Sequence, residues 1–286
     1  MRILSPAKIN LHLRIGLPGA DGFHPLLSWM CTVGMYDTIE MEAKGEPGVR
    51  LRCDRHDVPV DGSNLIVRAG EALGRPHLGA DVILHKKIPM GGGLGGGSSN
   101  AAFALQGFNE LWSLHHSTSR LAEIGARLGS DVVFFLHGPS SVCAGRGERV
   151  TPIGHPLAKV AVLIFPKLSM STPAVYRRFD EMELGSSDAI EQQPDWKAWQ
   201  QLPAERLLPW LKNDLEAPAF SLCPELGELR QRLERQIGQT VRMSGSGSTL
   251  FTLMDDSDAA EAVAARIRQP AIAVELCDLS PNSTEI

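Results

Sequence analysis

Glycine crowds one short segment of the chain, residues 89–97, and two serines follow it. A glycine-rich loop that opens a helix is typical of phosphate-binding sites, because the unpaired N–H groups and the dipole of the first helical turn favour an anion. Glycine also lets the backbone itself approach a bound group closely. The loop reads PMGGGLGGGSS: Pro89, Met90, Gly91, Gly92, Gly93, Leu94, Gly95, Gly96, Gly97, Ser98 and Ser99.

The elements on either side of this loop support that interpretation. Residues 81–89 read DVILHKKIP, which predicts a strand that ends at Pro89, and after the loop Ala101, Leu105 and Phe108 recur at helical spacing. We expect Ser98 or Ser99 to cap this helix, with phosphate or Mg²⁺ contact as the alternative role. A flexible linker would not be framed by a strand and a helix.

Three known kinds of nucleotide loop fit less well. A Walker A loop has lysine before the serine, whereas Gly97 precedes Ser98 here. Gly91, Gly93 and Gly96 match the dinucleotide fingerprint, but the acidic residue expected about twenty positions later is missing, since Glu110 comes too early. Protein-kinase signatures are absent from the sequence.

Two charged residues are candidates for catalysis. Lys8 lies in a predicted strand and shares a face with Asn10, where an ordinary lysine would be solvated. Asp131 follows a predicted helix, 119–128, that stops at Gly129. Its apolar neighbours suit a general base, and capping of the next element is the alternative.

The pattern of elements predicts an α+β chain of two parts. Alternation places Ile9, Leu11, Leu13 and Ile15 on one face of the first strand, and 63–73 is predicted helical. We expect residues 1–150 to form an N-terminal lobe that carries the glycine-rich phosphate loop. Residues 151–286, predicted as β-α-α-β-β-α-β, are expected to form a C-terminal, ferredoxin-like α+β lobe. The acidic stretch 180–200 is interpreted as a solvated insertion.

Composition excludes several classes of partner. The chain has 286 residues, 43% hydrophobic and 21% charged, with a formal net charge of −5, so nucleic acid is not expected to be its partner. No segment approaches the ~20 apolar residues of a membrane span. The N-terminus does not resemble a signal peptide, and five scattered cysteines form neither a metal cluster nor a disulfide framework. We therefore expect a cytoplasmic protein, with neither membrane nor metal site identifiable.

Three motifs together resemble one superfamily, that of galactokinase, homoserine kinase and mevalonate kinase, the GHMP kinases. They are PAKINLHL at 6–13, PMGGGLGGGSSN at 89–100 and MSGSGSTLF at 243–251. The resemblance covers residues 6 to about 279. It implies a two-lobed GHMP-kinase fold with the active site in the cleft between the lobes, and ATP, with Mg²⁺, as the phosphate source. The doubled glycine triplet and ADGFH at 20–24 are similar to one branch, whose acceptor is the 2-hydroxyl of a cytidine-diphosphate-linked methylerythritol in non-mevalonate isoprenoid biosynthesis.

The resemblance also assigns roles to residues. It implies that Lys8 holds the acceptor hydroxyl and the γ-phosphate, and that Asp131 faces it as the base. Relatives have proline where Val133 stands, a change that affects rigidity and not chemistry. For the acceptor, the resemblance implies that Phe23 and Tyr176 stack on cytosine, with their ring types exchanged relative to the family, and that His24 recognises the polar edge of the base. It also implies substrate hydrogen bonds from Asn10 and Thr172 and closure over the substrate by residues 244–248. On the ATP side, it implies that Asn64, Leu65 and Lys86 line the adenine.

Rival hypotheses remain at this point. Within the superfamily, a homoserine or mevalonate-type kinase is the alternative. A nicotinamide oxidoreductase using residues 91–96 lacks the ribose-binding acid, and a catalytically dead nucleotide-binding module would be expected to have lost Lys8 or Asp131. We expect a small-molecule kinase, monomeric or weakly homodimeric.

Overall fold

The computed structural model describes residues 1–281. The N-terminal half builds a six-stranded sheet in the order β3-β4-β2-β5-β6, with β1 paired to β2. Strand β2 is long enough to pair with β5 through its first residues and with β4 through its last, while β1 runs antiparallel along it. The strands are β1 (Arg2–Ile15), β2 (Leu26–Lys44), β3 (Gly48–Cys53), β4 (Gly79–His85), β5 (Ser140–Gly145) and β6 (Arg149–Pro152).

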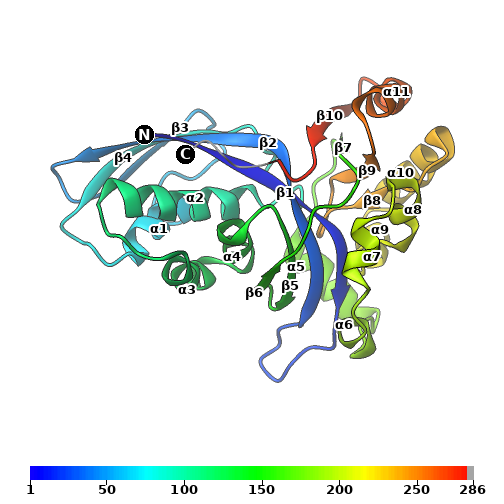
Figure 1. Ribbon diagram of the computed structural model, residues 1–286, viewed down its shortest axis with the longest axis horizontal. Helices are drawn as coiled ribbons and strands as arrows, with labels where there is room; N and C mark the ends of the chain where they lie inside the picture. The colour runs from blue at the N-terminus through cyan, green and yellow to red at the C-terminus, as the bar shows by residue number, and fades with distance from the viewer. Residues whose placement is uncertain (282–286) are drawn as a thin grey trace.

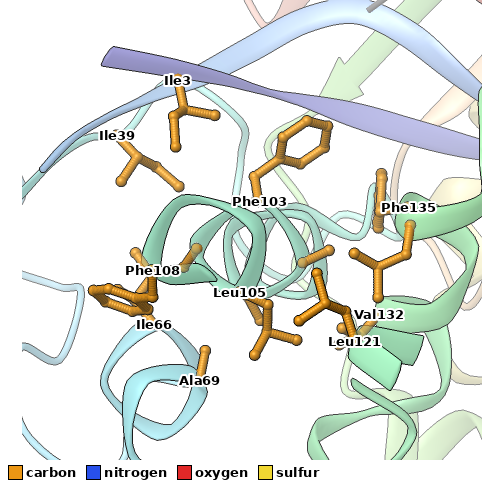
Figure 2. Packing of buried hydrophobic residues seen from close by; sticks show 14 of the residues in the cluster. Ile3, Ile39, Ile66, Ala69, Phe103, Leu105, Phe108, Leu121, Val132 and Phe135 are labelled. Atoms are coloured by element: carbon orange, nitrogen blue, oxygen red, sulfur yellow. The ribbon is translucent and has the colours of Figure 1, made fainter. Parts of the chain in front are cut away.

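Four helices pack together beside this sheet, as Figure 1 shows. They are α1 (Leu65–Ala72), α2 (Gly96–Leu111), α3 (Thr118–Leu128) and α4 (Ser130–His137). Helix α2 is the central one, because it is apolar on nearly all sides and most of its residues are buried. Phe103, Leu105 and Phe108 of α2 contribute to a core that includes Ile3 and Ile39 of the sheet (Figure 2).

The C-terminal half is a four-stranded sheet with its own helices. The strand order is β10-β7-β9-β8, and all pairings are antiparallel. Its strands are β7 (Val160–Pro166), β8 (Arg242–Met243), β9 (Leu250–Met254) and β10 (Ile272–Asp278). Its helices are α5 (Thr172–Glu181), α6 (Asp188–Glu191), α7 (Trp196–Gln200), α8 (Ala204–Leu207), the 3₁₀ turn η1 (Leu208–Trp210), α9 (Glu216–Leu222), α10 (Pro224–Ile237) and α11 (Ser257–Ile267).

Strand β1 joins the two halves of the molecule. The alternation predicted for it breaks, because its pairing with β2 shifts register between Asn10 and His12. Ile9 and Leu11 pack in a cluster with Trp29 and with Leu163 of β7, whereas Leu13 and Ile15 pack in a second cluster, which contains Val162 of the same strand. The prediction of a single apolar face was therefore wrong: an irregular register moves the side chains that follow it into another cluster.

Two other sequence expectations need correction. The strand before the glycine loop ends at His85, not at Pro89. The stretch 180–200 is not simply solvated, since it contains α6 and α7 and its two tryptophans pack in the core cluster around Trp29. Trp196 and Trp199 lie edge-on to the buried ring of His12, with centroids 5.9 and 5.3 Å away. The prediction rested on the low aliphatic content of the stretch and overlooked these two aromatic side chains, which supply the buried apolar surface.

Candidate active site

Residues from both halves of the chain line a cleft of about 590 Å³. The glycine loop forms one wall, and β1, α4, α5 and the turn between β8 and β9 contribute the others. Most of the residues singled out from the sequence line it: Lys8, Asn10, Asn64, Leu65, Lys86, Pro89, Met90, Gly91, Gly92, Gly93, Leu94, Gly95, Gly96, Gly97, Ser98, Asp131, Thr172 and Tyr176. The lining does not include Ser99, Phe23 or His24.

The glycine loop is shaped by alternate residues with left-handed backbone conformations. Gly91, Gly93 and Gly95 have φ values of 68°, 76° and 67°, which other residues rarely adopt. Two of them also admit close neighbours: a Cβ on Gly93 would lie 2.0 Å from the Ser244 carbonyl oxygen, and one on Gly95 would lie 3.0 Å from the Lys8 stem. The glycines therefore let other parts of the site approach the loop.

Helix α2 begins at Gly96, with Gly95 as its N-cap and without a side-chain cap. The expectation that Ser98 or Ser99 caps this helix was wrong, because both serines lie within the first turn. Ser98 lines the cleft. Ser99 is buried, and its hydroxyl has no hydrogen-bond partner among the described residues. The helix thus presents its uncapped N–H groups at the loop, which suits an anionic ligand.

Lys8 is buried at the base of the cleft rather than solvated. Its ammonium donates to the Asn10 amide oxygen at 2.6 Å and lies 3.4 Å from an Asp131 carboxylate oxygen. The backbone N–H of Lys8 donates to the Leu94 carbonyl at 2.9 Å, which ties β1 to the glycine loop. The lysine charge is therefore held between the loop and the carboxylate.

Asp131 lies in the first turn of α4, whose N-cap is Gly129. The alternative interpretation, that Asp131 caps this helix, was wrong. The helix dipole favours the carboxylate at this position, and its side chain is 32% exposed, so the cleft can reach it. Its negative charge is close enough to raise the pKa of the neighbouring Tyr176, together with the larger effect of burial, to about 12. Tyr176 is accordingly a neutral phenol in this cleft.

The turn between β8 and β9 closes against both β1 and the glycine loop. The Ser244 hydroxyl accepts from the Asn10 backbone N–H at 3.2 Å and donates to the Gly93 carbonyl at 3.0 Å. The Ser246 hydroxyl lies 2.7 Å from that of Thr172, at the start of α5. The third sequence motif thus meets the first two in one place.

Phe23 and His24 lie on the loop between β1 and β2, beside the cleft. Phe23 is 57% exposed, and the Arg146 guanidinium lies over its ring, 4.1 Å from the centroid. Both ring nitrogens of His24 face oxygens at 2.9 Å, those of Gly16 and Asp180. The His24 ring is 5.8 Å from that of Tyr176. Phe23 and Tyr176, the stacking pair expected from the sequence, thus each contact another side chain here, Arg146 and His24 respectively.

Arg146 is a cleft residue that sequence reasoning missed. It lies in the turn between β5 and β6 and pairs with the exposed Asp21, on the same loop as Phe23. The available signal was a lone cation between two glycines in AGRGE. Its partner is on the surface, whereas the other two cations of the cleft, Lys8 and Lys86, pair with Asp131 and the buried Asp37.

The arrangement can bind a phosphate group and activate a hydroxyl. A loop and a helix start suited to an anion lie beside a buried ammonium, and a carboxylate faces that ammonium. These are the parts that phosphoryl transfer requires, since it depends on positioning and charge stabilisation. Within residues 1–281 no three metal-binding side chains of the His, Cys, Asp or Glu types cluster, and no helix is long and apolar enough to cross a membrane.

Comparisons with known proteins agree with this chemistry. The family described as GHMP kinases N terminal domain matches residues 64–139, and that described as GHMP kinases C terminal matches 189–273. The chain is 38% identical to the 4-diphosphocytidyl-2-C-methyl-D-erythritol kinase of a Nocardioides species, with 91% of each chain covered. It is 37% identical to the enzyme of the same name from Bacillus velezensis, with 89% of each covered.

Solved structures extend the likeness to the fold. A crystal structure of 4-(cytidine 5'-diphospho)-2C-methyl-D-erythritol kinase aligns with a TM-score of 0.77 at 34% identity, over 99% of this chain and 100% of the other. A homoserine kinase from Cytophaga hutchinsonii aligns with a TM-score of 0.66 at 19% identity, over 98% of this chain and 94% of the other, which is a likeness of fold alone.

Proposed function

The chain belongs to the 4-diphosphocytidyl-2-C-methyl-D-erythritol kinase family of the GHMP kinases, and from this premise we propose how its cleft carries out the reaction. The protein is an ATP-dependent kinase that phosphorylates the 2-hydroxyl of 4-diphosphocytidyl-2-C-methyl-D-erythritol, a step of non-mevalonate isoprenoid biosynthesis. The observation that carries the site assignment is the Lys8–Asp131 pair, 3.4 Å apart beside the glycine loop. A homoserine or mevalonate-type activity is less well supported, because the relatives named above that are at least 34% identical share one activity in their names, whereas the homoserine kinase is only 19% identical.

ATP is proposed to bind with its phosphates in the loop 89–99. The backbone N–H groups at the start of α2 meet the phosphate oxygens, and the positive φ angles of Gly91, Gly93 and Gly95 turn the loop around them. Asn64, Leu65 and the stem of Lys86 line the adenine side, which fits their place in the cleft wall. Asn64 also caps α1 by accepting from the Ile66 N–H, which fixes its orientation.

Mg²⁺ is proposed to accompany ATP. This hard cation keeps several waters and is usually held by phosphate oxygens with one or two protein oxygens. The Ser98 hydroxyl, in the cleft at the first turn of α2, is the donor that fits, and a cluster of protein carboxylates is not required. When bound, the ion neutralises negative charge on the phosphates.

The transfer step is assigned to Lys8 and Asp131. Asp131 accepts the proton of the acceptor hydroxyl as the hydroxyl oxygen forms a bond to the γ-phosphorus. The bond between that phosphorus and the β–γ bridging oxygen breaks, and ADP leaves with the bond's electron pair. The Lys8 ammonium stabilises the charge on the transferred group. Asn10 holds the ammonium at 2.6 Å and so keeps it aimed at the reacting atoms.

The cytidine part of the acceptor is proposed to lie toward α5. Thr172 and Asn10 provide hydrogen bonds, Tyr176 and Phe23 stack on cytosine, and His24 recognises its polar edge. Arg146 is proposed to meet the diphosphate, because its present partner, Asp21, is half-exposed and easily replaced. Stacking between both rings requires Arg146 to leave the face of Phe23, and the diphosphate supplies the reason for it to move.

Two further assignments complete the proposal. We divide the chain into an ATP-binding lobe, 1–150, and a C-terminal lobe, 151–286, because each half has its own sheet; this boundary falls within β6, shortly before the segment that leads to β7. The five free cysteines suit a reducing compartment, so the cytoplasm is the proposed location. The protein is proposed to act as a monomer or weak homodimer on a small molecule, without nucleic acid.

The direct test is phosphate transfer from ATP to a panel of alcohols, followed by detection of ADP and of the phosphorylated product. The panel contains the cytidylated methylerythritol, homoserine, mevalonate and the uncytidylated methylerythritol phosphate. Turnover with the cytidylated compound alone supports the proposal. Comparable turnover with homoserine or mevalonate would contradict it.

A further inference from the structure

A buried carboxylate beneath the cleft makes an unusually complete set of contacts. Asp37, on β2, is fully buried. One of its oxygens accepts from the backbone N–H groups of Lys87 and Ile88, both at 2.8 Å. The other accepts from the Asn100 side chain at 2.9 Å and from the Lys86 ammonium. Four donors from two segments therefore converge on a single side chain.

These two segments are the two ends of the glycine loop. Residues 86–88 directly precede Pro89, and Asn100 directly follows Ser99, in the first turns of α2. We infer that Asp37 is a positioning residue for ATP, which fixes the separation and direction of the two ends of the phosphate loop. This inference rests on the proposed placement of the ATP phosphates in that loop.

Asn100 is the link on the helix side of the loop. It is 3% exposed, and its amide group donates both to Asp37 and, at 2.7 Å, to the Ser5 hydroxyl on β1. Because it stands on the first turns of α2, it fixes that end of the helix against two strands. The N–H groups that would meet phosphate belong to the same turns, so their direction depends on this contact.

Lys86 completes the set of contacts around Asp37. We call this set, Asp37 with residues 86–88 and Asn100, the clamp. Its ammonium lies 2.8 Å from the position that a Cβ on Gly96 would occupy, directly against the start of α2. The ammonium and the carboxylate are both buried, at 4% and 0% side-chain exposure, so each satisfies the charge of the other. The stem of Lys86 thus lines the cleft while its charge serves the clamp, and the loop backbone remains to meet the phosphates.

The chemistry of the site requires a carboxylate. An asparagine at 37 would still accept from Lys87 and Ile88 through its oxygen. Its NH₂ group, however, would face the Lys86 ammonium and the Asn100 amide, which are themselves donors. One end of the loop would stay attached while the other lost its anchor.

The test compares two asparagines on the same helix. Asn100→Ala removes the clamp contact and leaves Asp37 with its other three donors. Asn109→Ala is the matched control, because Asn109 exchanges two hydrogen bonds with the backbone of His116 and anchors the far end of α2. The readouts are the Kd of ATP by titration calorimetry, the KM values for ATP and for the cytidylated acceptor, and the melting temperature.

We expect Asn100→Ala to raise the Kd and KM of ATP about tenfold, equivalent to ~1.4 kcal/mol, with the acceptor KM unchanged. Asn109→Ala should lower the melting temperature without changing either KM. If Asn100→Ala does not fold, Asn100→Ser, with its shorter side chain, should show the same ATP-specific loss. Equal shifts in the two KM values, or the same KM values in both variants, would overturn the inference.

ATP binding by two variants, Gly95→Val and Asn100→Ala, distinguishes a failure of the clamp from a failure of the proposed phosphate site. Gly95→Val protein that binds ATP normally would refute the phosphate site and the clamp with it. Loss of ATP binding in Gly95→Val, together with normal ATP binding in Asn100→Ala, would refute the clamp alone.

Discussion

The Lys8 ammonium lies between two oxygens, 2.6 Å from that of the Asn10 amide and 3.4 Å from that of the Asp131 carboxylate. The shorter contact fixes the lysine, and the longer one leaves space at the carboxylate. Lys8 is almost fully buried whereas the Asp131 side chain is one-third exposed, so an incoming hydroxyl can reach the carboxylate from the cleft. The pair therefore combines a fixed cation with an accessible proton acceptor.

Asp131→Asn should bind ATP normally and lose turnover. The amide cannot accept the hydroxyl proton, and removal of a general base typically lowers the rate ~10²–10⁴-fold. Calorimetry measures ATP binding, and coupled ADP release measures kcat. Asp256→Asn is the control, since Asp256 caps α11 and is not among the cleft residues. A near-normal kcat in Asp131→Asn would assign catalysis to Lys8 and positioning alone.

Gly95→Val should abolish nucleotide binding. The valine would adopt φ of 67° and bring its Cβ to 3.0 Å from Lys8, which would displace both the loop and the ammonium. Gly74→Val is the matched control, because Gly74 has the same φ and open space around it. Both variants carry the same backbone strain. If only Gly95→Val loses more than ~1.4 kcal/mol of ATP affinity, about tenfold, the loss comes from the glycine loop and not from strain in general.

The sequence predicted the individual elements of the site better than the contacts between them. The glycine loop between a strand and a helix is a local pattern, and so is the helix that ends at Gly129 before Asp131. Arg146 over Phe23, and Asp37 under the loop, are contacts between segments far apart in the chain. Their residue types carry no local signal, because periodicity reports which face is buried and not what lies against it.

The same limit applies to the fold. The register shift in β1 between Asn10 and His12 leaves no trace in the apolar alternation, so a single face was predicted where two clusters exist. Within 180–200, few aliphatic residues indicated a solvated stretch, but Trp196 and Trp199 supply enough apolar surface to anchor it beside His12. Tertiary contacts decided both outcomes.

His12 should make the protein sensitive to acid. Burial, followed by the charges of Arg14, Lys212 and Arg242, lowers the pKa of His12 from 6.5 to about 3. Its Nδ1 accepts from the Lys212 N–H at 3.1 Å, which requires the neutral ring. Below pH 6.5, His12 binds a proton in the unfolded chain but stays neutral in the folded state. The free energy of unfolding therefore decreases as the pH falls from 6.5 toward 3.

The measurement is the free energy of unfolding in denaturant at pH 7.5, 6.5, 5.5 and 4.5. His12→Asn keeps an acceptor for the Lys212 N–H but does not titrate, so its stability should fall less steeply below pH 6.5, by about 1.4 kcal/mol per pH unit. Exposed His77 provides the control, since His77→Asn should follow the wild-type pH profile. Parallel profiles for wild type and His12→Asn would show that His12 binds a proton as readily in the folded state as in the unfolded chain.

The cytosine-binding hypothesis makes the most specific prediction about the substrate. Phe23 is exposed beside the cleft and Tyr176 lines it, so their rings are proposed to stack on the base once Arg146 has moved to the diphosphate. Stacking contributes ~1–3 kcal/mol per base in nucleic-acid complexes. Phe23→Ala or Tyr176→Ala should therefore weaken binding of the cytidylated substrate about ten- to a hundred-fold, with ATP binding unchanged.

The control for these variants is Phe220→Ala, because Phe220 also lies under an arginine, Arg230, but is not among the residues that line the cleft. A uridine analogue of the substrate presents an acceptor where cytosine has its N4 donor, which leaves a polar group unpaired, so it should bind far more weakly. Normal affinity of both alanine variants for the cytidylated substrate would show that the two rings serve only packing. Equal turnover of the uncytidylated methylerythritol phosphate would remove the base from recognition altogether.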